Sequence, residues 1–272
     1  MSAPHAHTFE DYRAIPAVNW SNLKHADRSP LHYLYARDHG VTETDPMRLG
    51  GAVHTLALEP DLFESRYTVW TEARTSNAWK AYKAANADRI ILTADQDARA
   101  HGIAAAIRAH PVAAHYLDGG LFEQTLTWVD EVTGLPCKAR ADILSKRCNA
   151  VIDLKTYADL SPRAFESATF KLGYPCQLSH YRNGAIANGI LSADCETVII
   201  GVESKAPFDV GVFVLDSESM AHGAAKVAEL LAKVRACTDA NEWPGRYPTT
   251  QAYMLPEWAR QAPDITFEEE ES

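Results

Sequence analysis

Three strand-like segments follow one another between residues 121 and 157, and this run constrains the fold more than any other part of the chain. The segment FEQTLTWVD alternates polar and apolar residues, as a half-buried strand does. A turn, VTG, separates it from a second segment, LPCKARADIL, and a third, AVIDLK, follows. Short apolar runs bounded by turn residues are typical of neighbouring strands. We therefore predict a meander of three strands.

Helical patterns precede the meander. Residues 16–38 are predicted to form a helix in two pieces broken at Pro30, with Ser21 at an N-cap position. In residues 47–67, apolar side chains recur on one helical face, and Pro60 ends the run. The residues of that face are Leu49, Val53, Leu56 and Ala57. Residues 71–89 are polar, and residues 95–116 form an alanine-rich helix that ends near Pro111.

After the meander the pattern alternates between helix and strand. Residues 161–189 are helical around Gly173 and Pro175, and two strands follow at 197–204 and 209–216. A long amphipathic helix over 217–240 closes the fold, with Ser217 as its expected cap. This order predicts an α/β fold with a mixed central sheet flanked by helices. We assign residues 1–265 to a single domain and residues 266–272 to a solvated, disordered acidic tail.

The composition excludes several classes of protein. The net charge of −10 argues against a protein that coats DNA, but an enzyme can carry metal-binding carboxylates and still hold phosphates on a local basic strip. The five cysteines are scattered, which predicts reduced thiols in a cytoplasmic protein and neither zinc nor an iron–sulfur cluster. Neither a membrane span nor a secretory signal is expected.

Acidic and basic residues interrupt the strands of the meander. Asp142 lies near the end of the second strand, and Asp153 and Lys155 lie at the end of the third, on one face because they are two residues apart. If these strands are neighbours, the two carboxylates converge, and a cation between them relieves their repulsion. Mg²⁺ accepts such oxygen ligands, and a lysine beside it stabilises charge on a phosphate. A lone Asp-x-Lys, however, is more often a surface ion pair.

Four further residues are candidates for the same site. Gln177 and Tyr181 share a helix face, where an amide and a phenol can hydrogen-bond a nucleotide; a half-buried tyrosine on a helix surface is the alternative. His54 follows two glycines in GGAVHTLAL, and Glu123 opens the first strand of the meander. Each is also compatible with an ordinary structural position.

Taken together, these motifs match a known family. RLGGAVHTLALEP, KARADIL, VIDLKTYADLSPRAF and YPCQLSHY, with SPLHYLYARDHG before them, resemble the RecE-type exonuclease VIII branch of the PD-(D/E)XK nuclease superfamily. The likeness covers roughly residues 18–215, and each motif is weak alone but specific in this order. It implies a core similar to those of restriction endonucleases and lambda exonuclease. Most members carry Glu where this chain has Asp153, but the RecE-type branch carries Asp.

The resemblance implies a role for each candidate. Asp142, Asp153 and the backbone carbonyl of Leu154 would bind metal, and Lys155 would be the catalytic lysine. His54 and Glu123 would bind or support a second metal ion, although imidazole on Mg²⁺ is chemically unusual. The helix bearing Gln177 and Tyr181 would contact DNA near the scissile phosphate. Ser21 and Arg74 would touch a DNA terminus or backbone.

The function implied is 5′-to-3′ digestion of linear double-stranded DNA, dependent on two Mg²⁺ ions for which Mn²⁺ can substitute. This leaves 3′ single-stranded overhangs for recombination with a single-strand annealing protein. A homo-oligomeric ring, trimer or tetramer, would enclose the DNA, with Arg74, Lys80 and Lys83 pointing inward. The apolar stripe Ala224, Val227, Leu231 and Val234 of the last helix would pack within the subunit or between subunits.

Three other functions remain open. Another PD-(D/E)XK nuclease, Cas4-like or RecB-like, is one, although the chain lacks the four clustered cysteines of the iron–sulfur types and any helicase motif. A catalytically inactive DNA-binding relative is the second, and the intact set of Asp142, Asp153 and Lys155 argues against it. A generic metal hydrolase would explain the acids but not Gln177 and Tyr181.

Overall fold

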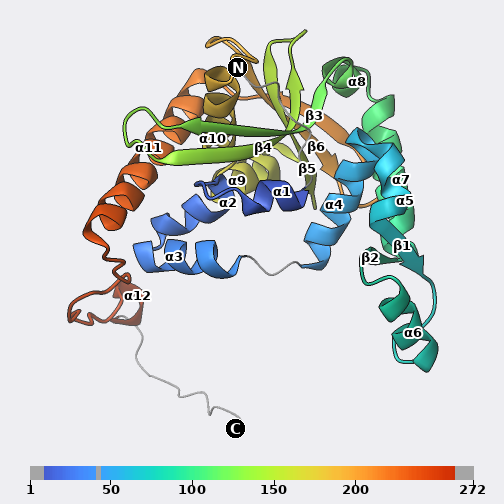
Figure 1. The fold of residues 1–272 in the computed structure, drawn as a ribbon, viewed down its shortest axis with the longest axis horizontal. Coiled ribbons are helices and arrows are strands. Elements are labelled where there is room, and N and C mark those ends of the chain that lie inside the picture. The colour runs from blue at the N-terminus through green and yellow to red at the C-terminus, as the bar shows by residue number, and fades with distance from the viewer. Residues whose placement is uncertain (1–8, 41–43, 261–272) are drawn as a thin grey trace.

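A five-stranded mixed sheet forms the centre of the computed structural model, which describes residues 9–40 and 44–260 (Figure 1). Its strands are β3 (Leu121–Val129), β4 (Pro136–Ser145), β5 (Ala150–Tyr157), β6 (Glu196–Glu203) and β7 (Val210–Val214), in that order across the sheet. Only the β5–β6 pair is parallel; the other neighbours are antiparallel. The predicted meander and mixed sheet are both confirmed. The acidic tail lies outside the described residues, so its disorder stays a prediction.

Helices cover both faces of the sheet. On one face lie α4 (Asp45–Leu58), α7 (Ala94–Ala109) and α8 (Pro111–Leu117); on the other lie α9 (Pro162–Lys171) and α10 (Tyr174–Ala187), with α11 (Ser217–Ala240) packed on α10. β5 serves both layers, because Ile152 and Leu154 pack with α4 and α7 while Val151 and Tyr157 pack with α9 and α10. This confirms the predicted fold class.

Two helices, one of them among the N-terminal helices, have caps that differ from the predictions. The N-terminal elements are α1 (Phe9–Ala14), α2 (Trp20–Leu23), the 3₁₀ turn η1 (Lys24–Asp27) and α3 (Pro30–His39). Ser21 is not an N-cap but an exposed residue inside α2; Asn19 is the cap, and its side chain accepts the N–H of Asn22 at 2.8 Å. The cap of α11 is likewise Asp216 rather than Ser217. In both cases the capping side chain sits on extended backbone one residue before the helix begins.

An arm that the sequence patterns missed extends away from the sheet, at the lower right of Figure 1. After η2 (Pro60–Leu62) and α5 (Phe63–Arg66), the strands β1 (Tyr67–Trp70) and β2 (Ile90–Thr93) pair in parallel, and α6 (Asn77–Ala85) connects them. The rings of Trp70, Trp79 and Tyr82 pack together, with centroids 5.7 and 4.8 Å from Trp70. Strands of four residues carry too little alternation to be recognised in a sequence.

The apolar stripe of α11 packs within the subunit. Val227, Leu231 and Val234 are buried against the N-terminal helices, whereas Ala224 is exposed, contrary to its predicted place in the stripe. The buried position in that turn is Gly223, where a Cβ would overlap the backbone carbonyl of Pro175. The helix therefore covers the subunit's own core. A short helix, α12 (Glu257–Arg260), follows it.

Two predictions from composition can be compared with the structure. All five cysteines are free thiols, as expected. Within residues 9–40 and 44–260, no helix has the length and apolar character needed to cross a membrane.

Candidate functional site

The site lies where β4 and β5 stop pairing. Their ladder ends at the pair Ile143–Ile152, so Asp142 and Asp153 come immediately beyond it. In place of a further ladder bond, the backbone N–H of Leu154 donates to Oδ2 of Asp142 at 2.9 Å. A carboxylate thus occupies the position where strand pairing would otherwise continue. Asp142 and Asp153 converge as the sequence predicted.

The inside–outside alternation of β3 and β4 changes phase at the same level. On β4, Ala141 packs with the α10 layer, yet Ile143, two residues later, packs with the α4 layer. Phe122 and Leu126 of β3 show the same switch, and between them Glu123 has a φ of +49°. A left-handed backbone is costly for a residue with a side chain, and strain of this kind tends to cluster at functional sites. The distortion places carboxylates between two helical layers.

Asp153 is held from the α10 side. Its side chain is fully buried, with Nζ of Lys155 2.6 Å from Oδ2 and Nε2 of Gln177 donating to Oδ1 at 3.1 Å. The amide of Gln177 also donates to the hydroxyl of Tyr181 at 2.9 Å. These contacts join all four side chains in one network. Gln177 therefore orients the carboxylate of Asp153, and Tyr181 holds the Gln177 amide in place.

His54 reaches the same site from α4. Its Nε2–H donates to the carbonyl of Leu154 at 2.8 Å, and its Nδ1 lies 3.7 Å from carboxylate oxygens of both Glu123 and Asp142. One possible ligand atom from each of His54, Glu123 and Asp142 falls within 4.8 Å of the others. Nε of Arg140 donates to the second oxygen of Glu123 at 2.7 Å.

The crowding of buried charges perturbs the protonation of these groups. Burial alone would lower the pKa of His54, but the carboxylates of Asp142 and Glu123 outweigh it and raise the pKa to about 9. Burial, together with the nearby charge of Asp153, raises the pKa of Asp142 to about 7. The pKa of Lys155 is raised despite its burial, because Asp153 and Asp142 favour its charged form. The acidic cluster thus attracts cations.

The donor set fits a divalent metal ion. Glu123, Asp142 and His54 supply two carboxylates and one imidazole, with the carboxylate of Asp153 on the neighbouring strand, and oxygen-rich sites of this kind suit Mg²⁺ and Mn²⁺. Oδ2 of Asp153 is buried and, within the part of the chain that the structure describes, has no aligned hydrogen-bond donor, only the Lys155 ammonium beside it. The carbonyl of Leu154, a predicted ligand, accepts the His54 hydrogen bond, and its contact with metal stays a prediction.

Two predicted DNA contacts lie outside this cluster. Arg74 is exposed on the arm, where it donates to the carbonyl of Ile91 at 3.2 Å and stands 5.0 Å from the centre of the Trp79 ring. Ser21 is exposed on α2. Their contacts with DNA stay predictions.

The sequence interpretation missed three residues around the site. Arg140 pairs with Glu123, and the ring of Tyr174 lies 5.2 Å from Nζ of Lys155. Lys138 is buried, and its ammonium donates to three carbonyls at the end of α1 at 2.6–3.1 Å. The alternation of Lys138, Arg140 and Asp142 in CKARAD was a readable signal, because residues two apart share a strand face.

A buried histidine behind the site gives a testable pH dependence. His180 is 1% exposed, lies 4.7 Å from the ring of Trp128, and donates to the carbonyl of Lys138 at 3.1 Å. Burial lowers its pKa from 6.5 to about 4. Since the unfolded chain binds the proton more tightly, the free energy of unfolding should fall as the pH falls from 6.5 to 4. Between pH 7 and 5 we expect His180 to contribute about 2 kcal/mol to this loss.

Urea unfolding at both pH values tests this expectation. His180→Gln retains a side-chain donor but cannot titrate, so its loss of stability between pH 7 and 5 should be smaller than that of the wild type. His101→Gln, which changes a half-exposed histidine of α7, is the matched control. Equal pH dependence in all three proteins would contradict the assignment.

Comparisons with known proteins agree with this geometry. A family model described as a PDDEXK-like domain of unknown function (DUF3799) matches residues 19–253. A candidate exonuclease from Eubacterium rectale has a similar fold, with a TM-score of 0.61 and 14% identity over 95% of this chain and 99% of that one.

A phage-related exonuclease from Haemophilus somnus is 12% identical over 85% of this chain and 99% of its own, with a TM-score of 0.36, too low to bear on the fold. No functionally curated protein matches the sequence. The family match and the acidic site together support a nuclease dependent on a divalent metal. Because the model spans most of its length, the chain belongs to the PDDEXK-like family DUF3799 of the PD-(D/E)XK nuclease superfamily.

Proposed function

We propose that the protein is a 5′-to-3′ exodeoxyribonuclease of the RecE type, which digests linear double-stranded DNA with Mg²⁺ or Mn²⁺ and leaves 3′ overhangs. The observation that carries this proposal is the pair of buried carboxylates, Asp142 and Asp153, with the half-buried Lys155 beside them, at the point where β4 and β5 separate. A structural ion pair would not need a second carboxylate beside the first, because like charges in a buried site repel.

Each residue has a role in this reaction. Asp142, Asp153, Glu123 and His54 would hold the metal. A divalent ion held there would activate water and neutralise charge on the phosphate. Lys155, fixed against Asp153, would stabilise the negative charge that grows on the phosphate oxygens. Gln177 keeps Asp153 in position through Oδ1. Because imidazole prefers softer ions than Mg²⁺, the presence of His54 favours tolerance of Mn²⁺.

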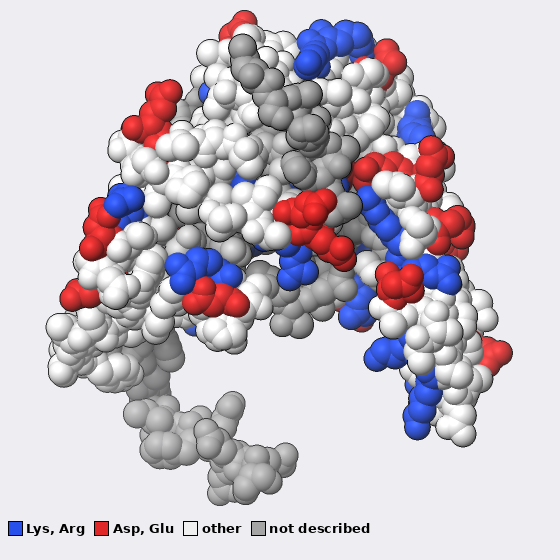
Figure 2. Space-filling model, in the orientation of Figure 1, with Lys and Arg blue, Asp and Glu red and all other residues white. Residues whose placement is uncertain are grey.

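The shape and charge of the arm support a path for DNA. Figure 2 shows a hollow between the arm, at the lower right, and the part of the molecule at the lower left, with basic side chains of the arm along its border. Residues 67–93 carry four basic side chains (Arg74, Lys80, Lys83 and Arg89) and two acidic ones (Glu72 and Asp88). The arm is therefore positive in a chain whose net charge is −10, and phosphate binding needs such a local concentration of positive charge.

A ring of three or four subunits and a single-strand annealing protein complete the proposal. An acidic protein has little general attraction to DNA, and a closed ring keeps the substrate enclosed during long digestion. Since the stripe of α11 packs internally, other surfaces would form the ring. Light scattering on the purified protein measures the subunit number, and a monomer would contradict the ring.

One assay tests the activity. Linear duplex labelled at either the 5′ or the 3′ end is incubated with the protein in Mg²⁺, Mn²⁺ or EDTA, with Asp153→Asn as the inactive control. We expect release of the 5′ label first, only with metal, and no cutting of closed circular DNA. Cutting of closed circles would favour another PD-(D/E)XK nuclease. Binding without any cleavage would favour an inactive relative.

A further inference from the structure

A groove of about 750 Å³ lies beside the candidate catalytic lysine. It runs between α2 and η1, the turn that joins α9 to α10, and α11. The α9–α10 turn connects it to the site, because Gly173 and Pro175 line the groove and Tyr174 between them lies 5.2 Å from Nζ of Lys155. At Gly173 the backbone has a φ of +70°, and a Cβ there would lie 3.1 Å from the ring of Trp20, which also lines the groove. The turn is therefore closely fitted against α2.

Two large apolar side chains, one at the end of α9 and one in this turn, are exposed at the groove. Phe170 is 71% exposed and Leu172 is 56% exposed. The ring of His222, on α11, lies 6.0 Å from that of Phe170. Exposed apolar side chains grouped at the mouth of a groove indicate a binding surface rather than a core.

The charge of the groove fits a polyanion. Its acidic residues, Asp27 and Glu229, are both paired with Lys226, at 2.6 and 3.0 Å. Lys24 and Lys171 also line the groove, and among the described residues neither has an ion-pair partner within 4 Å. Two ammonium groups thus remain available for phosphates beside the exposed apolar side chains.

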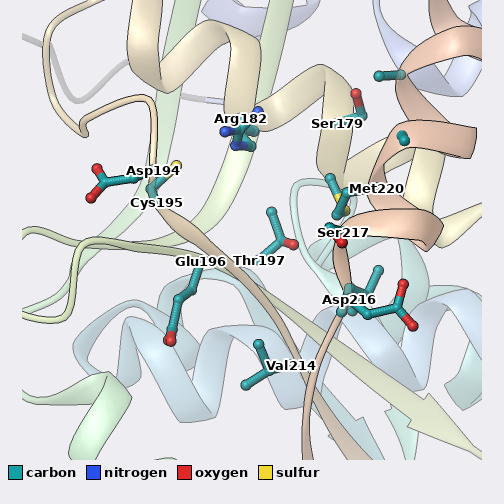
Figure 3. A pocket seen from close by; sticks show the side chains of 13 residues that line it. Ser179, Arg182, Asp194, Cys195, Glu196, Thr197, Val214, Asp216, Ser217 and Met220 are labelled. Atoms are coloured by element: carbon teal, nitrogen blue, oxygen red, sulfur yellow. The ribbon is translucent and has the colours of Figure 1, made fainter.

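A second pocket, of about 420 Å³, shows the contrast (Figure 3). Its lining includes three acidic side chains, Asp194, Glu196 and Asp216, and one basic side chain, Arg182. Arg182 already donates to the carbonyl of Ala193. This pocket has an apolar wall at Val214, but its three carboxylates outnumber its one guanidinium, which disfavours a phosphate, so it provides a control for the first groove.

We propose that the groove beside Lys155 binds an unpaired stretch of the DNA strand that enters the site, an inference that rests on the proposed nuclease function. Phe170 and Leu172 contact the faces of its bases, and Lys24 and Lys171 contact its phosphates. Only an unpaired strand can use both features, because the bases of an intact duplex are already stacked on one another. The end of a duplex would have to separate before its strand reaches the groove.

Binding of a blunt duplex and of the same duplex with an unpaired tail on either strand tests this inference. Fluorescence anisotropy is measured in Ca²⁺, which takes the same oxygen ligands as Mg²⁺. The double variant Phe170→Ser with Leu172→Ser should lower the affinity for the duplex whose tail is on the strand that enters the site, by about 10-fold or more. Its affinity for the blunt duplex should change less than about twofold. Phe170→Trp should retain the tailed affinity, because indole also stacks. Val214→Ser, in the second pocket, should change neither affinity.

Two results would overturn the inference. The first is a double variant that binds tailed and blunt duplexes as the wild type does. The second is a double variant with unchanged tailed affinity and an altered subunit number, which would assign the groove to contacts between copies. Either result leaves the proposed function standing if the wild-type protein still digests DNA. A wild-type protein that cleaves no DNA in Mg²⁺ or Mn²⁺ would instead refute the function itself.

Discussion

Lys155→Ala is expected to lower the rate of metal-dependent DNA hydrolysis by about 10²- to 10³-fold. The side chain of Lys155 is 19% exposed; its ammonium lies 2.6 Å from Asp153 and is the positive group closest to that carboxylate in the described structure. The substitution removes a positive charge that is held in position before the reaction begins. The negative charge that grows on the phosphate in the transition state is then less well stabilised. Single-turnover cleavage of end-labelled duplex measures the effect without interference from product release.

Controls must separate chemistry from folding. Removing one partner of a buried ion pair leaves an uncompensated charge and costs about 3–5 kcal/mol of stability. Lys155→Met removes the charge but keeps a side chain of similar size, so it separates loss of charge from loss of packing. Thermal unfolding gives the temperature below which each variant is folded, and cleavage is measured below it. Lys146→Ala, on the exposed turn after β4, should behave as the wild type does. A folded Lys155→Ala protein that cleaves at the wild-type rate would remove Lys155 from the catalytic role.

Asp142→Asn and Asp153→Asn are expected to weaken binding of Mg²⁺ or Mn²⁺ by at least about 10-fold, because even residues behind the ligands of a metal contribute that much. Isothermal titration calorimetry measures the affinity. The rate of cleavage should fall together with the metal affinity, since both acids lie where β4 and β5 stop pairing. His54→Gln should have a smaller effect if His54 supports only one of two ions.

Thermal stability provides an independent measure of the same two variants. Without metal, Asp142 and Asp153 lie near each other in a buried site, so neutralising Asp142 relieves repulsion. Asp142→Asn should therefore unfold at the same or a higher temperature than the wild type in EDTA. The wild type should gain stability when metal is added, because a ligand that binds only the folded state stabilises it, and the variant should gain little. Unchanged metal affinity in both Asp variants would contradict their assignment as ligands.

Much of this arrangement follows from local sequence patterns. A period of two in FEQTLTWVD and LPCKARADIL predicts neighbouring strands, and the apolar face of residues 47–58 predicts a buried helix; the structure contains both. The spacing of Asp153 and Lys155 determines that they share a face of β5, since side chains alternate along any strand. The pair of helices around Gly173 and the closing helix also follow from composition and periodicity.

Only the tertiary structure decided where these pieces meet. The sequence cannot show that the β4–β5 ladder stops one pair before Asp142, or that Glu123 adopts a left-handed backbone and both strands change phase there. The contact of His54 with the carbonyl of Leu154 joins residues 100 positions apart, and the three backbone contacts of Lys138 join β4 to the N-terminus. The physical reason is that periodicity records which face a side chain takes within one element. The register between elements depends on the summed packing of many distant side chains, and a bulge or a broken ladder leaves no periodic trace.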